Sequence, residues 1–417
     1  MVRAPAGGTA GQRWIRPAQH GAVRREIVIR FRRREFDCAS RGAVGAARWA
    51  FAFVFLLAPG CGQPEADRRS TAAYESPHAA AIGEARTLLD SLMQAEAIPG
   101  LSVAVGRGIQ LIWSEGFGFS DLTHNVMVTP LTRFRVGSVS KPITAAALGV
   151  LVEAGALDLD APVQDYVPSF PEKRWPVTTR LLAGHLGGIR HYRGMENFSR
   201  TRYPTVLSGL AIFADDSLIN EPGTEYSYSS YAWNLISAVV EGAGGEDFLE
   251  YMDRVVFDPL GMDRTVADRN GPVIPDRTRF YVADSAGQVF NAPYVDNSYK
   301  WAGGGFLSTP EDMLVFANAH LEPGFLQAET LEMLFTSQRL RDGTETGYGI
   351  GWRSATNEHG ERIVSHTGGS VGGRTVLTLN RDTGLIVAIV ANLSGAPISN
   401  ALAGRVEEIF RGGAEAN

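Results

Sequence analysis

The chain has 417 residues, of which 44% are hydrophobic and 20% charged, and this composition is typical of a globular protein with a sizeable core. The first sixty residues hold eleven arginines against three acidic residues, so the rest of the chain carries 28 basic and 42 acidic side chains, a net charge of about −14. That acidic body argues against a nucleic-acid-binding surface. Cys38 and Cys61 are the two cysteines, so the body has neither a disulfide framework nor a cysteine metal site.

Residues 1–60 are predicted to be a leader and signal segment. Two arginines precede an apolar run over 49–58, an order that is typical of a secretory signal, and the run is too short to span a membrane. The stretch 57–61 resembles a bacterial lipoprotein signal, which implies that Cys61 is lipidated after cleavage. We therefore expect an exported protein, periplasmic or at the cell envelope, with a lipid anchor. The leader before residue 41 is too long for such a signal, so we expect translation to start downstream of Met1.

The body of the chain is predicted to be one domain over 78–412, joined to the signal by a small, polar tether over 61–77 and followed by a tail over 413–417. Its first part alternates strand and helix patterns. In chain order, the predicted elements are a helix over 79–95, strands over 101–105 and 110–113 joined by a turn at 106–108, a helix that starts near 138 and ends before 155, an irregular segment over 157–179, and helices over 178–186 and 232–241.

The last part of the chain is predicted to return to strands. A helix begins after residue 309, where a capping hydroxyl precedes a proline and two acidic residues. The elements predicted after it are strands over 348–352, 362–366, 374–379 and 385–391 and a helix over 401–410. Because strands occupy both ends and helices the middle, we expect an α/β fold: an antiparallel sheet built from N- and C-terminal strands and flanked by helices, with an inserted mainly helical region.

Ser138 and Lys141 form the strongest chemical signal. A serine hydroxyl attacks a carbonyl only when a nearby base accepts its proton, and a desolvated lysine can be that base whereas arginine cannot. The chain contains three lysines, and only Lys141 has a serine three positions before it. Since ordinary serine usage gives each lysine about a 7% chance of this spacing, the pair alone does not establish a catalytic site.

The sequence around the pair supports a catalytic interpretation. Residues 143–152 are apolar or small, which predicts a helix that is buried on all sides. Pro142 lacks an amide hydrogen and therefore fits the first turn of that helix. Ser138 is expected at the helix start, where unpaired N–H groups and the positive end of the helix dipole favour an oxyanion.

Two further patterns are candidates for the same site. A strand over 362–365 runs into His366-Thr367-Gly368-Gly369, where the glycines allow a ligand to approach the backbone and the Gly369 N–H could point at a substrate carbonyl. An ordinary edge-strand turn is the alternative. Tyr228 precedes a predicted helix among hydroxyl-bearing neighbours, and it is either functional or a core tyrosine.

Other chemistries lack their sequence patterns. His185 and His191 are six positions apart, which is not a metal-ligand spacing within one helix, and there is no H-E-x-x-H. A phosphate-binding glycine loop is absent, and Ser138 lacks the flanking pattern of a G-x-S-x-G nucleophile elbow. We therefore expect neither a metal nor a cofactor.

The S-x-x-K pair, the tyrosine motif and H-T-G, in this order, resemble the serine β-lactamase and penicillin-binding protein superfamily. The resemblance is strongest to its class C-like branch of peptidase S12 type, which also contains esterases, D-aminopeptidases and DD-peptidases. It covers roughly residues 80–411 and implies a β-lactamase/DD-peptidase-like fold. Within the branch, the chain is most similar to LACTB-type β-lactamase-like serine peptidases. The stretches similar to that group are 162–168, 185–192 and 296–305.

The resemblance implies a role for each matching position. Ser138 would be the acylated nucleophile, Lys141 its proton acceptor, and Tyr228 the group that passes the proton to the leaving group. The N–H groups of Ser138 and Gly369 would form the oxyanion hole. The positions that would line the substrate site are His366, Thr367, Gly368 and Ser230.

Two positions depart from the family pattern. Ser230 stands where the class C-like branch has an asparagine that orients a substrate amide. His366 stands where β-lactamases have a lysine that supplies a fixed positive charge. Both departures weaken the case for efficient antibiotic hydrolysis and favour a peptidase or an esterase. A histidine at position 366 could also make substrate binding depend on pH near neutrality.

The function expected from these features is a serine hydrolase or peptidase that cleaves a peptide or amide bond through a Ser138 acyl-enzyme. An esterase or weak β-lactamase is an alternative, and an acyl-binding sensor or scaffold is the non-enzymatic one. The expected partner is a peptide or small acyl substrate, and assembly into a homo-oligomer stays open.

Overall fold

The structure, a computed structural model, describes residues 69–72 and 77–412. The predicted leader, its lipidation site Cys61 and the tail over 413–417 lie outside the described residues. Within the predicted tether, Arg69–Ala72 forms strand β1, which pairs with strand β3 (Gln110–Asp121). These four residues therefore differ from the irregular tether that the sequence predicts.

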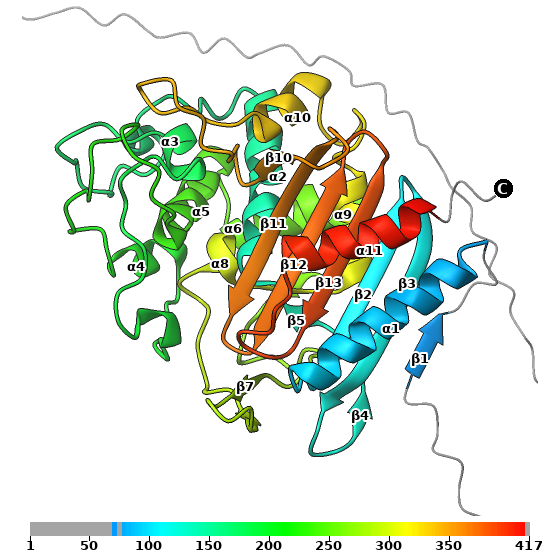
Figure 1. Cartoon of the computed structure of the whole chain (residues 1–417). Helices are drawn as coiled ribbons and strands as arrows, with labels where there is room; N and C mark the ends of the chain where they lie inside the picture. The colour runs from blue at the N-terminus through cyan, green and yellow to red at the C-terminus, as the bar shows by residue number, and fades with distance from the viewer. Residues whose placement is uncertain (1–68, 73–76, 413–417) are drawn as a thin grey trace, which may run out of the picture. The chain divides into compact units, whose positions relative to one another are not determined.

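An antiparallel sheet of eight strands forms the centre of the described residues (Figure 1). Its strand order is β1-β3-β2-β13-β12-β11-β10, and β4 (Val126–Met127) pairs with β3. The first and last parts of the chain thus meet where β13 pairs with β2. The bounds of the remaining strands of this sheet are Gly100–Arg107 for β2, Arg353–Thr356 for β10, Arg362–Ser370 for β11, Gly373–Asn380 for β12 and Leu385–Ala391 for β13.

Helices cover both faces of the sheet. On one face lie α1 (Ala79–Ala95) and α11 (Asn400–Gly412), and on the other lie α2 (Ser140–Glu153) and α9 (Pro310–Asn318) (Figure 1). Each face has its own apolar core. This arrangement confirms the predicted α/β fold with an antiparallel sheet flanked by helices.

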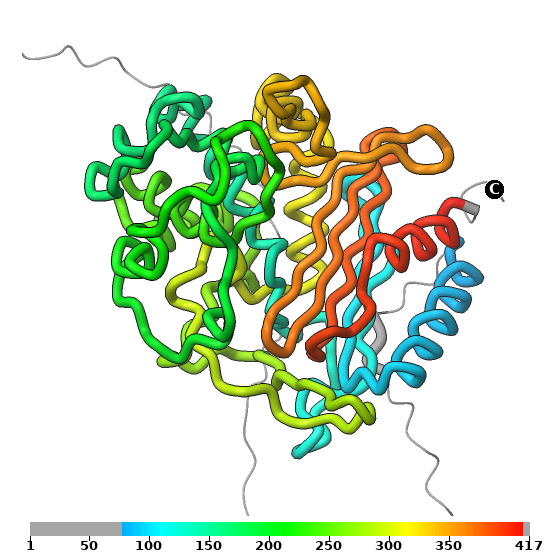
Figure 2. Tube along the Cα trace, turned by 60° about the vertical axis from the view of Figure 1, so that its left-hand side comes forward, coloured from blue at the N-terminus to red at the C-terminus, as the bar shows by residue number. Residues whose placement is uncertain are grey.

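The chain between β5 (Phe134–Arg135) and β9 (Phe306–Ser308) contains the predicted, mainly helical insertion, and its part over 179–244 lies at the β11 side of the sheet (Figures 1 and 2). Among the described helices, none combines the length and apolarity needed to cross a bilayer. The remaining helices longer than a single turn are α3 (Thr179–Ala183), α4 (Val206–Leu210), α5 (Ser230–Gly244), α6 (Phe248–Met252), α8 (Trp301–Gly304) and α10 (Ala328–Phe335).

Most predicted elements are confirmed, among them the helix over 79–95 and the strand over 385–391. Two differ. The helix predicted over 178–186 is only the five-residue α3, capped by the hydroxyl of Thr178. The strand predicted over 348–352 does not form, and only a single bridge joins Tyr348 to Arg353.

Candidate active site

Ser138 lies in a short 3-10 turn, η1 (Gly137–Val139), that leads directly into α2. Lys141 lies in the first turn of α2, so its amine returns towards the serine, and Lys141 Nζ is 3.1 Å from Ser138 Oγ. Gly137 has φ +52°, a left-handed conformation that strains other residues and favours glycine. The local fold therefore brings together the two side chains that the S-x-x-K spacing predicted as a pair.

The amine of Lys141 is fully buried. It donates to the carbonyl oxygen of Gly303 at 2.6 Å and to Ser230 Oγ at 3.2 Å, and none of its hydrogen-bond partners is a carboxylate. Because burial disfavours the charged form and no anion compensates, the pKa of Lys141 lies well below its usual value. The environment thus favours a neutral amine that can accept a proton.

Tyr228 lies just before α5, and Lys141 Nζ is 5.0 Å from the centroid of its ring. Burial raises the pKa of Tyr228 to about 12, although hydrogen bonds with the hydroxyls of Ser138 and Ser230 act against this rise. Tyr228 is therefore a protonated phenol near neutral pH. The same site thus shifts the pKa of a lysine down and that of a tyrosine up, which separates a base from an acid.

Strand β11 packs directly against the turn that carries Ser138. A Cβ on Gly368 would lie 1.9 Å from the carbonyl oxygen of Val136 and 3.2 Å from the backbone nitrogen of Ser138. A Cβ on Gly137 would lie 2.8 Å from the nitrogen of Gly369. The backbones that carry the nitrogens of Ser138 and Gly369 therefore touch each other.

The environment of His366 differs from the one expected. Its Nε2 is 2.9 Å from the Tyr348 hydroxyl and its Nδ1 is 2.7 Å from the carbonyl oxygen of Thr367, so both ring nitrogens are occupied. Burial lowers the pKa of His366 to about 3. The expectation that this histidine makes binding depend on pH near neutrality is therefore corrected, since it stays neutral there. Thr367 is half-buried beside it on β11.

Several side chains of the site were not selected from the sequence. His185 Nδ1 accepts a hydrogen bond from the Ser229 N–H at 3.1 Å, and His191 Nδ1 accepts one from the Ser230 N–H at 3.0 Å. Both histidines thus hold the start of α5, and burial lowers the pKa of His191 to about 4. Both histidines lie in the stretch 185–192, which the sequence analysis identified as similar to LACTB-type proteins without assigning a role to either side chain.

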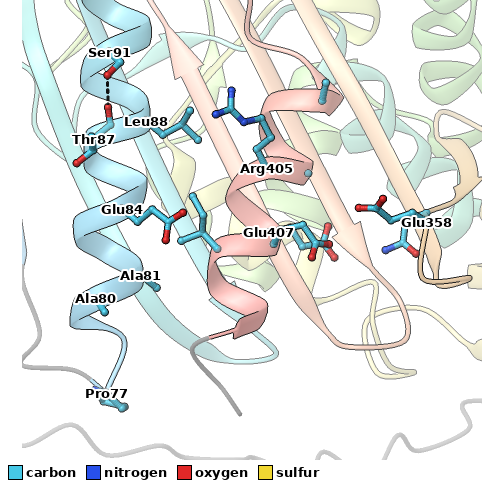
Figure 3. A pocket seen from close by; sticks show the side chains of 15 residues that line it. Pro77, Ala80, Ala81, Glu84, Thr87, Leu88, Ser91, Glu358, Arg405 and Glu407 are labelled. Atoms are coloured by element: carbon cyan, nitrogen blue, oxygen red, sulfur yellow. Dashed lines mark hydrogen bonds between the residues drawn. The ribbon is translucent and has the colours of Figure 1, made fainter. Parts of the chain in front are cut away.

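A hollow of about 1220 Å³ opens between α1 and α11, and none of its lining residues belongs to the candidate site (Figure 3). Beside it, Glu358, His359 and Glu408 bring their ligand atoms within 4.8 Å of one another. His359 is already hydrogen bonded to Glu408 at 2.9 Å, and the three side chains are exposed or half-exposed. We therefore assign no metal site to this surface cluster.

An antiparallel sheet, a helical insertion and a buried lysine beside a serine hydroxyl define a class of serine hydrolases. The family model described as Beta-lactamase matches residues 85–408. The chain therefore belongs to the β-lactamase family and is a serine hydrolase of that family. The predictions of family, fold and hydrolase activity are confirmed.

Individual relatives agree with this assignment. The serine beta-lactamase-like protein LACTB, mitochondrial, of Homo sapiens is 33% identical over an alignment that covers 77% of this chain and 78% of the relative. Penicillin-binding protein 4* of Bacillus subtilis (strain 168) is 26% identical over 308 residues, covering 70% and 67%. The octameric penicillin-binding protein homologue from Pyrococcus abyssi has a TM-score of 0.69 at 25% identity, covering 79% of this chain and 77% of the homologue.

Proposed function

We propose that this enzyme hydrolyses a peptide or peptide-like amide bond through an acyl group on Ser138. The observation that carries the proposal is the 3.1 Å distance between Ser138 Oγ and a fully buried amine without an acidic partner. A serine beside a neutral amine is an activated nucleophile, whereas a serine beside a charged ammonium is not.

Acylation forms a bond to Ser138 and then breaks the C–N bond of the substrate. Ser138 Oγ attacks the substrate carbonyl carbon while Lys141 Nζ takes the hydroxyl proton, and the N–H groups of Ser138 and Gly369 stabilise the negative charge on the carbonyl oxygen. When the C–N bond breaks, the Tyr228 hydroxyl gives its proton to the leaving amine and regains one from Lys141. The products of this half-reaction are the free amine and the ester of Ser138.

Deacylation reverses these transfers with water in place of the amine. A water molecule attacks the ester carbonyl as its proton passes through Tyr228 to Lys141. The C–O bond to Ser138 then breaks, and Ser138 regains its proton from Lys141. The second product is a carboxylic acid, and every group returns to its starting state.

Arg353 is the residue that we propose to recognise an anionic group on the substrate. It lies exposed at the start of β10, and within the described residues it makes no ion pair. Its Cζ is 5.6 Å from the centroid of the Tyr348 ring, whose hydroxyl is 2.9 Å from His366 Nε2, so Arg353 lies close to the site. A peptide with a free carboxylate fits this charge. Ser230 and the neutral His366 argue against efficient hydrolysis of β-lactam antibiotics.

The test compares wild type with Ser138→Ala on amino-acid anilides, short-chain nitrophenyl esters and nitrocefin. We expect turnover of anilides above that of nitrocefin, and its loss in the variant. Equal turnover by both proteins on every substrate would overturn the role of Ser138. A single burst of acylation without steady turnover would instead favour an acyl-binding sensor. Preference for the nitrophenyl esters would favour an esterase.

We also propose that the hydrolase domain spans 78–412 and that the mature protein is exported and anchored through a lipid on Cys61. The support is the order of arginines, apolar run and cysteine before the domain. Mass spectrometry of the membrane fraction tests this, since an intact, unlipidated Met1 terminus would contradict it. We further propose that the protein assembles with copies of itself, which the octameric homologue from Pyrococcus abyssi supports. Analytical ultracentrifugation tests this, and a monomer would contradict it.

A further inference from the structure

His185 stands in a backbone position that usually belongs to glycine. It follows the short helix α3, and its φ of +62° lies in the left-handed region. The His185 N–H donates to the carbonyl oxygen of Leu182 at 3.1 Å. The next N–H, that of Leu186, donates to the carbonyl oxygen of Leu181 at 2.7 Å. This pair of hydrogen bonds is a common way to end a helix, with glycine as the usual residue at the left-handed position. The backbone alone therefore does not account for a histidine here.

The ring of His185 is buried among three tyrosines. Its centroid is 4.2 Å from that of Tyr228, 4.7 Å from that of Tyr348 and 5.8 Å from that of Tyr226. Burial holds the pKa of His185 well below its usual value, so the ring is neutral near neutral pH. Its Nδ1 accepts from the Ser229 N–H, which can only donate, so the hydrogen of the neutral ring is on Nε2. Within the described residues this buried Nε2 has no hydrogen-bond partner, which costs stability.

Two hydrogen bonds join His185 to both neighbours of Tyr228. The carbonyl oxygen of His185 accepts from the Ser227 N–H at 2.9 Å, and its Nδ1 accepts from the Ser229 N–H at 3.1 Å. Tyr228 itself lies in an irregular segment, because α5 begins only at Ser230. The contacts of His185 therefore fix the backbone on each side of Tyr228, and its ring packs against the phenol between them.

We propose that His185 is a positioning residue that holds the Tyr228 hydroxyl where it protonates the leaving amine. The inference rests on the proposed role of Tyr228 in the reaction. Proton transfer requires the donor to lie within hydrogen-bond distance of the departing nitrogen. Without Nδ1, the Ser229 N–H loses its acceptor, the irregular segment shifts, and the Tyr228 hydroxyl is less often in the reactive position. This role explains a histidine at a position where the backbone favours glycine.

Tyr228 serves only part of the proposed reaction, so its position is measured by comparing two reactions at Ser138. An amino-acid anilide releases an amine, which must gain a proton as the C–N bond breaks. A fluorophosphonate instead forms a bond from its phosphorus to Ser138 Oγ as the P–F bond breaks. The serine proton passes to Lys141, and fluoride leaves without a proton. The labelling rate therefore reports the Ser138–Lys141 pair, whereas kcat/KM for the anilide also reports Tyr228.

We expect His185→Gly to lower kcat/KM for the anilide about tenfold per labelled active site, the effect of losing one buried hydrogen bond. The labelling rate should stay within about twofold of wild type, since the Ser138–Lys141 pair is unchanged. Glycine also suits the left-handed backbone, which keeps the end of α3 in place. Tyr228→Phe, which lacks the transferable proton, should show the same selectivity with a larger loss.

Two further variants separate the hydrogen bond from general damage to the fold. His185→Asn places an amide oxygen near the position of Nδ1, and asparagine tolerates a positive φ, so kcat/KM for the anilide should return to within about threefold of wild type. His320→Asn is the matched control. His320 is also fully buried, and its Nδ1 is 2.8 Å from the carbonyl oxygen of Phe316 in α9. This control should lower Tm and leave both rates per labelled active site at the wild-type value.

An equal fall in both rates would mean that His185 supports the site as a whole, and it would overturn the inference. Wild-type anilide turnover by His185→Gly would overturn it too, as would a His185→Asn variant no better than His185→Gly. If His185→Gly does not fold, His185→Phe keeps a ring among the three tyrosines and removes the acceptor, and the same selective loss is expected. Absence of a Ser138 adduct on wild type would instead refute the proposed function.

A double-mutant cycle tests whether His185 acts through Tyr228. Once the Tyr228 hydroxyl is absent, His185 has no proton donor to position. We therefore expect His185→Gly to change kcat/KM for the anilide by less than about twofold in the Tyr228→Phe background. A further tenfold loss in that background would mean that the two residues act independently, and it would contradict the proposal.

Discussion

At the scale of single residues, the site depends on the charge of one amine. Lys141 is the described group that contacts Ser138 and is able to accept its proton, and its hydrogen-bond partners are all neutral. The structure thus uses burial rather than a neighbouring cation to lower the pKa of this lysine. Arginine, which does not lose its proton, cannot perform the same step.

We predict that Lys141→Arg lowers kcat/KM at least about a hundredfold, the low end for loss of a positioned base. Lys141→Met tests the same role without the larger guanidinium group, and it should give a similar loss. Lys173→Arg is the control, since Lys173 Nζ donates a hydrogen bond to the backbone carbonyl oxygen of Asp216, away from the site. Retention of activity by either Lys141 variant would contradict the assignment of the base.

We predict that kcat/KM falls as pH drops through the pKa of Lys141, because the protonated amine cannot accept a proton. His366 and His191 have pKa values of about 3 and about 4, so neither changes charge near neutrality. His366→Gln should therefore leave the midpoint of this acid limb in place, whatever it does to the maximal rate. A limb that vanishes in the variant would show that His366, not Lys141, is titrating.

The sequence predicts the Ser138–Lys141 pair better than it predicts the groups that surround the pair. Ser138 and Lys141 are visible because three positions separate them on one turn. Gly303 is 162 positions from Lys141, and its carbonyl meets the amine only after α8 folds beside α2. His185 lies 44 positions from Ser229, and its Nδ1 meets the Ser229 N–H only after packing. Such contacts have no local pattern.

At the scale of elements, the site depends on direct contact between β11 and the turn before α2. We predict that Gly368→Ala lowers activity more than tenfold and stability by about 1–3 kcal/mol, since its Cβ would overlap the Val136 carbonyl oxygen and force the backbones apart. Gly83→Ala in α1 is the control. Its Cβ would meet nothing within 4 Å, and alanine favours helix, so its Tm should stay or rise. Thermal unfolding alongside turnover checks both, and a fully active Gly368→Ala would refute the contact.

The wrongly predicted strand over 348–352 shows where periodicity misleads. Tyr348, Ile350 and Trp352 alternate with glycines as in a strand, and all three are buried. The backbone between them packs against α2 instead of a neighbouring strand: a Cβ on Gly351 would lie 2.8 Å from the Cβ of Ala145. All five residues over 348–352 are buried. The alternation of large side chains and glycines therefore reflects packing under a helix here, which the sequence alone does not distinguish from a strand.

At the scale of the whole molecule, the sheet separates the site from a second core. Strands predicted at both ends of the chain correctly indicated one composite sheet, because their apolar residues need a common partner. The order of these strands in the sheet, with β13 next to β2, depends on long-range pairing, and the sequence did not predict it. The α1 and α11 layer lies on the face opposite α2, so it supports the sheet without touching Ser138.

We predict that Phe410→Ala lowers stability by about 3–5 kcal/mol, because this ring is fully buried and stacks on Trp113 at 5.9 Å. Turnover per labelled active site should stay at the wild-type value at temperatures where the variant is folded. Denaturant unfolding and active-site titration measure the two quantities. A proportional fall in turnover per site would mean that the two faces of the sheet are coupled.

The most direct test of the central claim is the charge of Lys141 in the free enzyme. The chain contains only three lysines, so NMR of lysine side chains labelled with carbon-13 and nitrogen-15 gives few signals, and the Lys141→Met variant assigns one of them. We predict that the Lys141 signal has the shift of a neutral amine at neutral pH, while Lys173 still has that of an ammonium. A Lys141 signal that titrates at the ordinary lysine pKa would contradict the mechanism.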